Sequence, residues 1–465
     1  MKNLLLFLCI PLSIFAQNQI GTTIIGEKET MRLGLSVSLS SDGSIIATTA
    51  NDAVRIYKNN NGVWQQIGST FSGQNVNDFH NSRVSLSSNG KIVAIGRPNK
   101  IGNFYREGLV QIYENKNGIW QQIGEDIKGI DLNDALGYNL SLSSDGNIIA
   151  ISNSKSVVKV FKNEAGVWQQ LGEDIIGRTD QDLFGTSVSL SSDGSVVAIG
   201  APFNHDGLAD SGYVRIYKNT NGLWQKIGQD INGDAVNDLL GYSLSLSSDG
   251  SIVAIGAPYN DGNSYDEGQV RIYKNNDGVW EQIGNTINGN TRNKRLGFSV
   301  SLSSYGTVLA IGTPFSKENG EDSGKVCIYK NNAGVWEQLG NDITGDYELN
   351  FLGHSLALSS DGNTLVVGGP DYAFGTTKIY SLSSILSSET ITNSNFSIYP
   401  NPASNQINLE VQNLDLKEVT IFNSIGQEVI KSKNKTINTS KLERGVYFVS
   451  VKTNLGKTTK KLIIN

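Results

Sequence analysis

One pattern of apolar and polar positions recurs along most of the chain. In one copy, alternating small polar and apolar residues ("SLSLSS") precede Asp-Gly, and a continuous apolar run ("SIVAIGAP") follows. Alternation with period two is typical of a half-buried strand, Asp-Gly of a two-residue hairpin, and the apolar run of a strand covered on both faces. A polar loop, the segment "GQVRIYKN", a second Asp-Gly turn and the segment "VWEQIGNTI" complete the copy. Each copy therefore predicts a four-stranded antiparallel meander.

The copies form a regular series. The phrase "SLSSDG" or a close variant occurs seven times, and each of the six tryptophans stands 26 residues before the next glycine that ends the phrase. A lone meander exposes two edges and cannot bury both faces, so repeats of this kind pack around an axis as propeller blades. We predict an all-β fold with a seven-bladed β-propeller over residues 19–381. The marker glycines are Gly43, Gly90, Gly146, Gly194, Gly250, Gly306 and Gly362.

The seventh copy is incomplete. It ends without a tryptophan strand, whereas the segment "QIGTTIIG", residues 19–26, resembles the end of a repeat such as "WQQIGSTFSG". A strand supplied from the other end of the repeat array completes the last blade and removes an open edge. We therefore predict that residues 19–26 pair with the strand around Ile379 and close the propeller.

The first residues, "MKNLLLFLCIPLSIFAQ", combine a lysine, an apolar run and a small residue at position 16. This pattern predicts a cleaved signal peptide over residues 1–16, and hence a protein that leaves the cytoplasm. The apolar run spans 13 residues, fewer than the ~20 that a transmembrane helix needs, so we expect no transmembrane segment.

Composition narrows the classes of partner. The 51 glycines and 8 prolines suit a turn-rich β fold, and the net charge of −6 divides into −11 for residues 1–395 and +5 for residues 396–465. An acidic body lacks the clustered Lys and Arg of a nucleic-acid groove, so we expect no nucleic-acid partner. Cys9 lies in the leader and Cys327 in a repeat strand, which leaves the mature chain without an internal disulfide.

A different pattern follows the repeats. Residues 382–395 are rich in Ser and Thr and show no periodicity, which predicts a linker. From residue 396, short strands such as "EVTIFNSIGQEVI" and "GVYFVSVKT" alternate with Asn, Gly and Pro turns. Residues 396–465 are therefore predicted to form a small immunoglobulin-like β-sandwich.

The repeats resemble a known design. The sequence "LGYSLSLSSDGSIVAIGAP" followed by "GQVRIYKN" resembles the FG-GAP repeats of integrin-like propellers, and "SLSSDGSIIA" looks like the core of WD-type blades. The FG-GAP resemblance implies a calcium loop of the form D-x-D-x-D-G, but this chain has only "SSDG" at that place. One carboxylate cannot supply the six to eight oxygens that Ca²⁺ takes, so we expect no metal site and no cofactor.

The tail resembles the type A sorting domain of the Bacteroidetes type IX secretion system. The resemblance rests on "YPNP" at residues 399–402, "GVY" at 445–447 and the ending "KKLIIN" at 460–465. It implies export across the inner membrane by the leader and across the outer membrane by recognition of the tail. The expected partner is the type IX secretion machinery, and the expected location is secreted or on the outer cell surface.

Loop lengths indicate a candidate face. From marker glycine to tryptophan the first six copies take 21, 30, 22, 30, 30 and 30 residues, so the variation falls in the loop between the second and third strands. Loops on a rigid scaffold carry binding, and carboxylates and aromatic rings suit cations or sugars. The alternative is that Asp, Asn and Gly only form turns there. The candidate ligand-binding residues are Tyr105, Phe203, Asp206, Asp210, Tyr259, Asp261, Tyr265, Asp266, Glu267, Glu321 and Asp322.

Three further sets of residues have structural interpretations. Asp residues at the blade crossings are predicted to order those crossings. The six tryptophans are predicted to fill the grooves between blades, the alternative being sugar platforms. His354 in "GHSLA" aligns with the Tyr of "GYSLS" and the Phe of "GFSVS", so we interpret it as an ordinary strand residue, and the serine-nucleophile elbow that this segment imitates lacks its strand-to-helix turn. The crossing carboxylates are Asp78, Asp134, Asp182 and Asp238.

These features predict a secreted or surface-displayed propeller that binds an extracellular glycan or protein. We expect no enzymatic activity and assign no catalytic residue, because the three histidines, at positions 80, 205 and 354, fall in different copies. The alternative is a secreted hydrolase or lyase for polysaccharides that uses loop carboxylates. A purely structural role at the cell surface is a third hypothesis.

Overall fold

The computed structural model describes residues 17–29, 31–73, 79–204, 208–262, 264–386, 396–411, 416–423, 428–453 and 456–465. The predicted signal peptide lies outside these ranges, as do residues 387–395 of the predicted linker. Two compact units separate between Leu382 and Ser383. Apart from the short helix α1 (Ser383–Leu386), the elements of the described ranges are strands, so the fold is all-β as predicted.

The larger unit repeats one sheet design. In its fifth copy, β23 (Ser243–Leu246), β24 (Ile252–Ala257), β25 (Gln269–Asn276) and β26 (Val279–Gln282) form an antiparallel meander, and β27 (Ile287–Asn288) also pairs with β25. The predicted fourth strand is therefore two short strands. The break falls at Gly284, whose φ of +75° takes the backbone out of the extended conformation.

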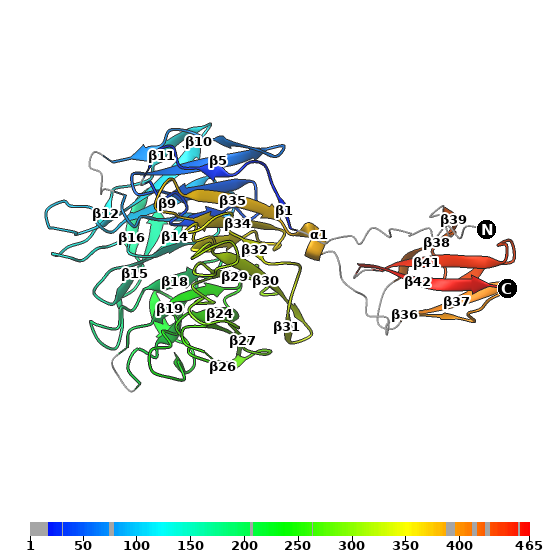
Figure 1. Ribbon diagram of the computed structural model, residues 1–465. Coiled ribbons are helices and arrows are strands. Elements are labelled where there is room, and N and C mark those ends of the chain that lie inside the picture. The colour runs from blue at the N-terminus through cyan, green and yellow to red at the C-terminus, as the bar shows by residue number, and fades with distance from the viewer. Residues whose placement is uncertain are drawn as a thin grey trace. The chain divides into compact units, whose positions relative to one another are not determined.

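The described residues contain seven such five-stranded sheets, which we number in chain order (Figure 1). Sheet 1 consists of β3 (Val37–Leu39), β4 (Ile45–Thr49), β5 (Ala53–Asn60), β6 (Val63–Gln66) and β7 (Phe71–Ser72). Sheet 2 consists of β8 (Arg83–Leu86), β9 (Ile92–Arg97), β10 (Leu109–Lys116), β11 (Ile119–Gln122) and β12 (Ile127–Lys128). Sheet 3 consists of β13 (Leu140–Leu142), β14 (Ile148–Ser152), β15 (Val157–Glu164), β16 (Val167–Gln170) and β17 (Ile175–Ile176). Sheet 4 consists of β18 (Ser187–Leu190), β19 (Val196–Ala201), β20 (Tyr213–Thr220), β21 (Leu223–Lys226) and β22 (Ile231–Asn232), and sheet 6 of β28 (Ser299–Leu302), β29 (Val308–Thr313), β30 (Lys325–Asn332), β31 (Val335–Gln338) and β32 (Ile343–Thr344). Sheet 7 consists of β33 (Ser355–Leu358), β34 (Thr364–Gly369) and β35 (Thr376–Ser381), joined by β1 (Asn18–Gln19) and β2 (Ile24–Ile25).

The sheets follow one another in a ring. The first strand of each sheet contacts the first strand of the next, and β33 of sheet 7 contacts β3 of sheet 1. This cyclic order of antiparallel sheets is consistent with a β-propeller.

The N-terminal strands complete sheet 7. Both β1 and β2 pair antiparallel with β35, and Figure 1 shows β1 beside it. The Ile20 amide donates to the Ile379 carbonyl at 2.7 Å, and the Gly26 amide donates to the Gly375 carbonyl at 3.1 Å. This is the pairing that the sequence predicts, because residues 19–26 occupy the place that β26 and β27 have in sheet 5.

The tryptophans join neighbouring sheets. The side chain of Trp280 in sheet 5 is only 3% exposed and packs with residues of both sheets 4 and 5. Its Nε1 donates to the Ile227 carbonyl at the outer edge of sheet 4, at 3.0 Å. All six tryptophans make this bond at 2.8–3.3 Å, and for Trp64 the acceptor is Ile20 of the closing segment. The groove-filling interpretation is confirmed.

The smaller unit contains two sheets over one core. One consists of β36 (Phe396–Tyr399), β37 (Gln406–Val411) and β40 (Thr436–Asn438), and the other of β38 (Leu416–Phe422), β39 (Glu428–Ser432), β41 (Gly445–Thr453) and β42 (Gly456–Ile464). Buried apolar residues from both sheets form its core, so the strands pack as a sandwich. They include Ile407, Ile437, Val419, Val449 and Leu462.

Candidate functional site

The long loops and the crossings between sheets share one face, as predicted. At the end of the loop in sheet 5, Gly268 forms a bridge with Leu296 of the crossing into sheet 6, and the Leu296 amide donates to the Glu267 carbonyl at 3.0 Å. Equivalent bridges join the loops of sheets 2, 4 and 6 to the crossings that follow them. We call this side of the larger unit the loop face.

The ring of first strands surrounds a cavity of about 480 Å³, which we call the axial cavity. Residues at the start of the first strands contribute from all seven sheets, and this end of each strand adjoins a crossing and hence the loop face. The volume lies in the range of about 300–1,000 Å³ that is usual for small-ligand sites. Its lining consists of Arg32, Leu35, Ser36, Val37, Asn81, Arg83, Val84, Tyr138, Asn139, Thr186, Ser187, Val188, Tyr242, Ser243, Leu244, Phe298, Ser299, Val300, His354, Ser355 and Leu356.

One position of the repeat differs from copy to copy inside this cavity. It stands eight residues before each marker glycine and, except in sheet 2, directly follows another glycine. Six of its seven side chains line the axial cavity. This lining was not predicted from the sequence, although the change of residue from copy to copy is a signal that could have indicated it. The interpretation of His354 as an ordinary strand residue is therefore wrong, because His354 directly precedes β33 and lines the cavity. In chain order the residues are Leu35, Ser82, Tyr138, Thr186, Tyr242, Phe298 and His354.

The next position joins neighbouring sheets in six of the seven copies. Ser36 Oγ accepts from the Val84 amide at 3.3 Å, and Asn139 Nδ2 donates to the Thr186 carbonyl at 2.8 Å. Ser187, Ser243, Ser299 and Ser355 each donate a hydroxyl hydrogen bond to a glycine carbonyl of the following crossing, at 2.7–2.8 Å. In sheet 2 the same position is Arg83, which lines the axial cavity. Sheet 2 therefore has a guanidinium group, that of Arg83, where the other copies have Ser or Asn.

The axial cavity is cationic. The described residues that line it include Arg32 and Arg83 but neither Asp nor Glu. Burial, together with the charges of Arg83 and Arg32, lowers the pKa of His354 to about 3, so this imidazole is neutral at physiological pH. Burial raises the pKa of Tyr242 to about 12, which keeps its hydroxyl protonated and able to donate.

Aromatic rings connect the cavity to the loops. The Phe298 ring lies 5.0 Å from Tyr242 and 5.1 Å from His354, and it meets Phe315 of the sheet 6 loop edge-on at 5.6 Å. The Arg295 guanidinium lies over Tyr259 at 4.4 Å and over Phe315 at 4.5 Å. These contacts are of the size that contributes about 0.5–1.5 kcal/mol each, so they hold the rings in place.

The structure brings together four of the predicted ligand-binding residues. Tyr265, Asp266, Glu321 and Asp322 line a second cavity of about 410 Å³ between the loops of sheets 5 and 6. Burial raises the pKa of Asp266, although its ion pair with Arg295 at 3.6 Å opposes the shift. Burial and the neighbouring Glu321 raise the pKa of Asp322.

The other predicted residues lie apart from this loop cavity. Tyr259 contacts Arg295 beside it, and Asp261 accepts a hydrogen bond from the Asp266 amide at 3.0 Å. Glu267 is buried at 1% exposure, and Tyr105, Phe203 and Asp210 line neither of the two cavities. Asp206 lies outside the described residues.

Some loop carboxylates occupy turns. Asp210, Asp266 and Asp322 have φ values of 51°, 49° and 49°, in the left-handed region that Asp tolerates. This geometry supports the alternative interpretation, in which these residues form turns.

The crossing carboxylates have the structural role that the sequence predicts. Asp238 is 1% exposed and accepts hydrogen bonds from the amides of Ala235 at 3.0 Å and Asp234 at 3.2 Å. Asp134 and Asp182 accept equivalent bonds from backbone amides four residues earlier. Asp78 lies outside the described residues.

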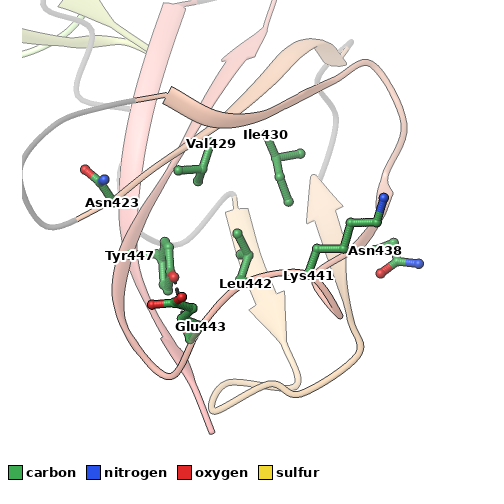
Figure 2. Close-up of a pocket in the computed structure, with 8 residues that line it drawn as sticks. All are labelled: Asn423, Val429, Ile430, Asn438, Lys441, Leu442, Glu443 and Tyr447. Atoms are coloured by element: carbon green, nitrogen blue, oxygen red, sulfur yellow. Dashed lines mark hydrogen bonds between the residues drawn. The ribbon is translucent and has the colours of Figure 1, made fainter.

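The smaller unit has its own cavity, of about 640 Å³ (Figure 2). Val429 and Ile430 of β39 lie on one side, and Leu442 and Tyr447 on another. The Tyr447 hydroxyl donates to the Glu443 carbonyl at 2.9 Å, which fixes the turn before β41. Asn423, Asn438, Lys441 and Glu443 complete the lining.

The sequence motifs of the tail join its two ends. Asn401 of "YPNP" accepts a hydrogen bond from the Ile463 amide at 2.9 Å and donates one to the Lys461 carbonyl at 2.8 Å. The first motif therefore holds the last strand, β42, in register.

In the described part of the chain, His, Cys, Asp and Glu side chains do not gather in groups of three or more that could hold a metal ion. No helix in the described ranges is long and apolar enough to cross a membrane.

We expect His354 to make stability depend on pH. Because its pKa falls from 6.5 to about 3 on folding, the unfolded state binds the proton first, and stability is lost as pH falls from about 6.5 towards 3. Replacing it as in His354→Phe, the residue type of the neighbouring copy, should reduce the loss between pH 7 and pH 4.5 by roughly 2 kcal/mol. Urea unfolding of both proteins at the two pH values measures this difference. Equal losses would contradict the assignment.

Comparison with known proteins identifies the tail. Residues 397–465 match the family described as "Secretion system C-terminal sorting domain", which supports the type IX sorting assignment. The chain is therefore a secreted or cell-surface protein, and the type IX secretion machinery is its partner in export. No curated protein matches the chain.

The larger unit has relatives in fold. A chain from Kuenenia stuttgartiensis hydrazine synthase matches with a TM-score of 0.51 and 12% sequence identity, over 75% of this chain and 95% of that chain. At this identity the likeness concerns the fold alone, and it agrees with a propeller-like arrangement of sheets.

Proposed function

We propose that the chain is a seven-bladed, FG-GAP-like β-propeller of a Bacteroidetes species that binds an extracellular ligand and carries out no chemistry on it. The type IX sorting tail places the protein outside the cell, where a binding module meets soluble or surface-bound ligands. The ligand site in this proposal is the mouth of the axial cavity, where Tyr242, Phe298 and His354 lie.

One observation carries the proposal. Seven copies of one repeat share the marker phrase, yet the position that lines the axial cavity in six of them is Leu, Tyr, Thr, Tyr, Phe and His in chain order. A structural position in a repeated sheet takes the same residue each time because its neighbours are the same. Different side chains around one cavity suit a ligand that is itself asymmetric.

The hydrolase or lyase alternative rests on the loop cavity. Two of its three carboxylates are in ion pairs, because Asp266 pairs with Arg295 and Glu321 pairs with Lys317. A general acid and a second carboxylate acting together would require at least one of these two to leave its cation. We therefore prefer the binding function.

A binding screen tests this proposal. We expect the full chain to bind members of an extracellular glycan array, and the Tyr242→Ala, Phe298→Ala double variant to bind at least tenfold more weakly. Tyr305→Ala is the matched control, since Tyr305 is 83% exposed and lies outside the axial cavity. Unchanged binding by the double variant would remove the axial site, and turnover of a bound glycan would favour the enzyme.

A further inference from the structure

We propose that the axial cavity recognises an anionic sugar residue, one that carries a carboxylate or a sulfate ester. This inference rests on the proposed function, because it names the ligand class of the same site. Three independent features of the cavity support it.

The first feature is the positive charge of the cavity lining, which is opposite in sign to the net charge of residues 1–395. Residues 1–395 carry a net charge of −11, yet the described lining of the axial cavity has two arginines and no carboxylate. The charges of Arg32 and Arg83 act together at His354. Positive charges that line a cavity attract anions more strongly than the same charges on an exposed surface, because less water screens them.

The second feature is the way in which sheet 2 breaks the repeat. The six other copies have Gly two residues before the position of Arg83, whereas sheet 2 has Asn81. Asn81 keeps the left-handed backbone, with φ of 59°, and so preserves the fold of the crossing. Sheet 2 has a guanidinium group in the cavity at the position whose Ser or Asn side chain bonds to the following sheet in the other six copies, and departures of this kind concentrate at functional sites.

The second arginine is held in place. The Arg32 guanidinium lies over the Tyr372 ring at 4.9 Å, and its Nε donates to the Pro370 carbonyl at 3.4 Å. A guanidinium group has five N–H donors, so one side of Arg32 is anchored while further donors stay available to a bound anion. In two other copies the same position is Leu, at 183 and 239, so the repeat does not need an arginine there.

The third feature suits the ring of a sugar. Tyr242 and Phe298 offer aromatic surface to the apolar face of a pyranose, and the protonated Tyr242 hydroxyl is a donor. The Nδ1 atom of His354 is buried and makes no hydrogen bond to the described residues. A sugar hydroxyl would satisfy this atom in either tautomer of the neutral imidazole, because a hydroxyl both donates and accepts.

Binding of three oligosaccharide probes to the full chain tests the inference by calorimetry. The probes are an oligogalacturonate, a sulfated galactan oligomer and the neutral galactan oligomer, with poly-glutamate as an anionic peptide. We expect one or both acidic sugars to bind at least tenfold more tightly than the neutral one, with affinity falling as salt rises. Poly-glutamate should bind weakly because it has no ring to stack.

Two variants use residues that the repeat itself supplies. Arg83→Ser and Arg32→Leu restore the residue types of other copies, so both should fold, and each should weaken binding of the acidic sugar at least tenfold. Lys128→Ala, on the outer strand β12, is the control and should bind normally.

The outcomes separate the inference from the proposed function. If the neutral oligomer binds as tightly as the acidic ones, and the Tyr242→Ala, Phe298→Ala variant loses this binding, the axial site stands and the anionic class is wrong. If poly-glutamate binds through Arg83 and the sugars do not, the sugar class is wrong. If no probe depends on Arg83 or on the aromatic pair, both proposals are wrong.

Discussion

Replacing Trp280 by alanine is expected to lower the free energy of unfolding by about 3–5 kcal/mol, the range for a buried tryptophan. The indole is 3% exposed, packs with residues of sheets 4 and 5, and donates to the Ile227 carbonyl at 3.0 Å. The truncation removes contacts on both sides of one interface between sheets. Because each sheet of a closed ring is held by two neighbours, the loss at one interface affects the whole ring.

Two related variants make this test specific. Trp64→Ala should cost less, since Trp64 is only half-buried although it makes the same kind of hydrogen bond. Trp280→Phe should recover most of the packing and lose only the Nε1 bond, a difference of about 1 kcal/mol. Urea unfolding followed by circular dichroism measures all three. A loss below 1 kcal/mol for Trp280→Ala would mean that the grooves between sheets contribute little to stability.

The sequence predicts the sheets well because each local signal has one physical solution. In "SSDG", Ser247 donates to Asp249 at 2.6 Å and accepts from the Ile252 amide at 2.9 Å, so the phrase fixes its own hairpin. Closure by residues 19–26 was predictable because Gly21 occupies the position in its segment that Gly228 occupies in sheet 4. In the structure Gly21 lies beside Trp64 as Gly228 lies beside Trp280. The split of the outer strand was missed, since a positive φ at Gly284 is not evident from an apolar pattern.

The candidate site was predicted less completely. Differences in loop length pointed to the loop face, and four of the predicted ligand-binding residues, among them Asp266 and Asp322, lie together in one cavity; their binding role stays a prediction. The axial cavity depends on a position that recurs every 47 to 56 residues, and its copies meet only when the ring closes. Period-two alternation assigns such a residue to a strand, but it does not show whether the side chain packs against other residues or faces a cavity at the axis. Arg83 gives little signal in the sequence because it stands just before the marker phrase of its copy, in "RVSLSSNG".

Removal of residues 17–26 is expected to lower the melting temperature by roughly 10 °C and to produce dimers or larger species. The deletion leaves β35 with an open edge, because β1 and β2 are its outer partners. It also removes Ile20, the acceptor for Trp64, so the interface between sheets 7 and 1 loses the bond that the other five tryptophans keep.

The point variant Gly21→Val distinguishes loss of the strand from loss of chain length. A Cβ at position 21 would lie 2.3 Å from the Gly62 carbonyl oxygen, in a backbone with φ of +72°, so valine should displace the strand. Thr22→Val, at the exposed neighbouring position, is the control and should melt like the wild type. Calorimetry and size-exclusion chromatography measure both effects. A synthetic peptide of residues 17–26 should bind the truncated chain as an added strand and restore the monomer, since an open edge accepts a matching strand. A truncated chain that stays monomeric with an unchanged melting temperature would show that the ring is stable without this strand.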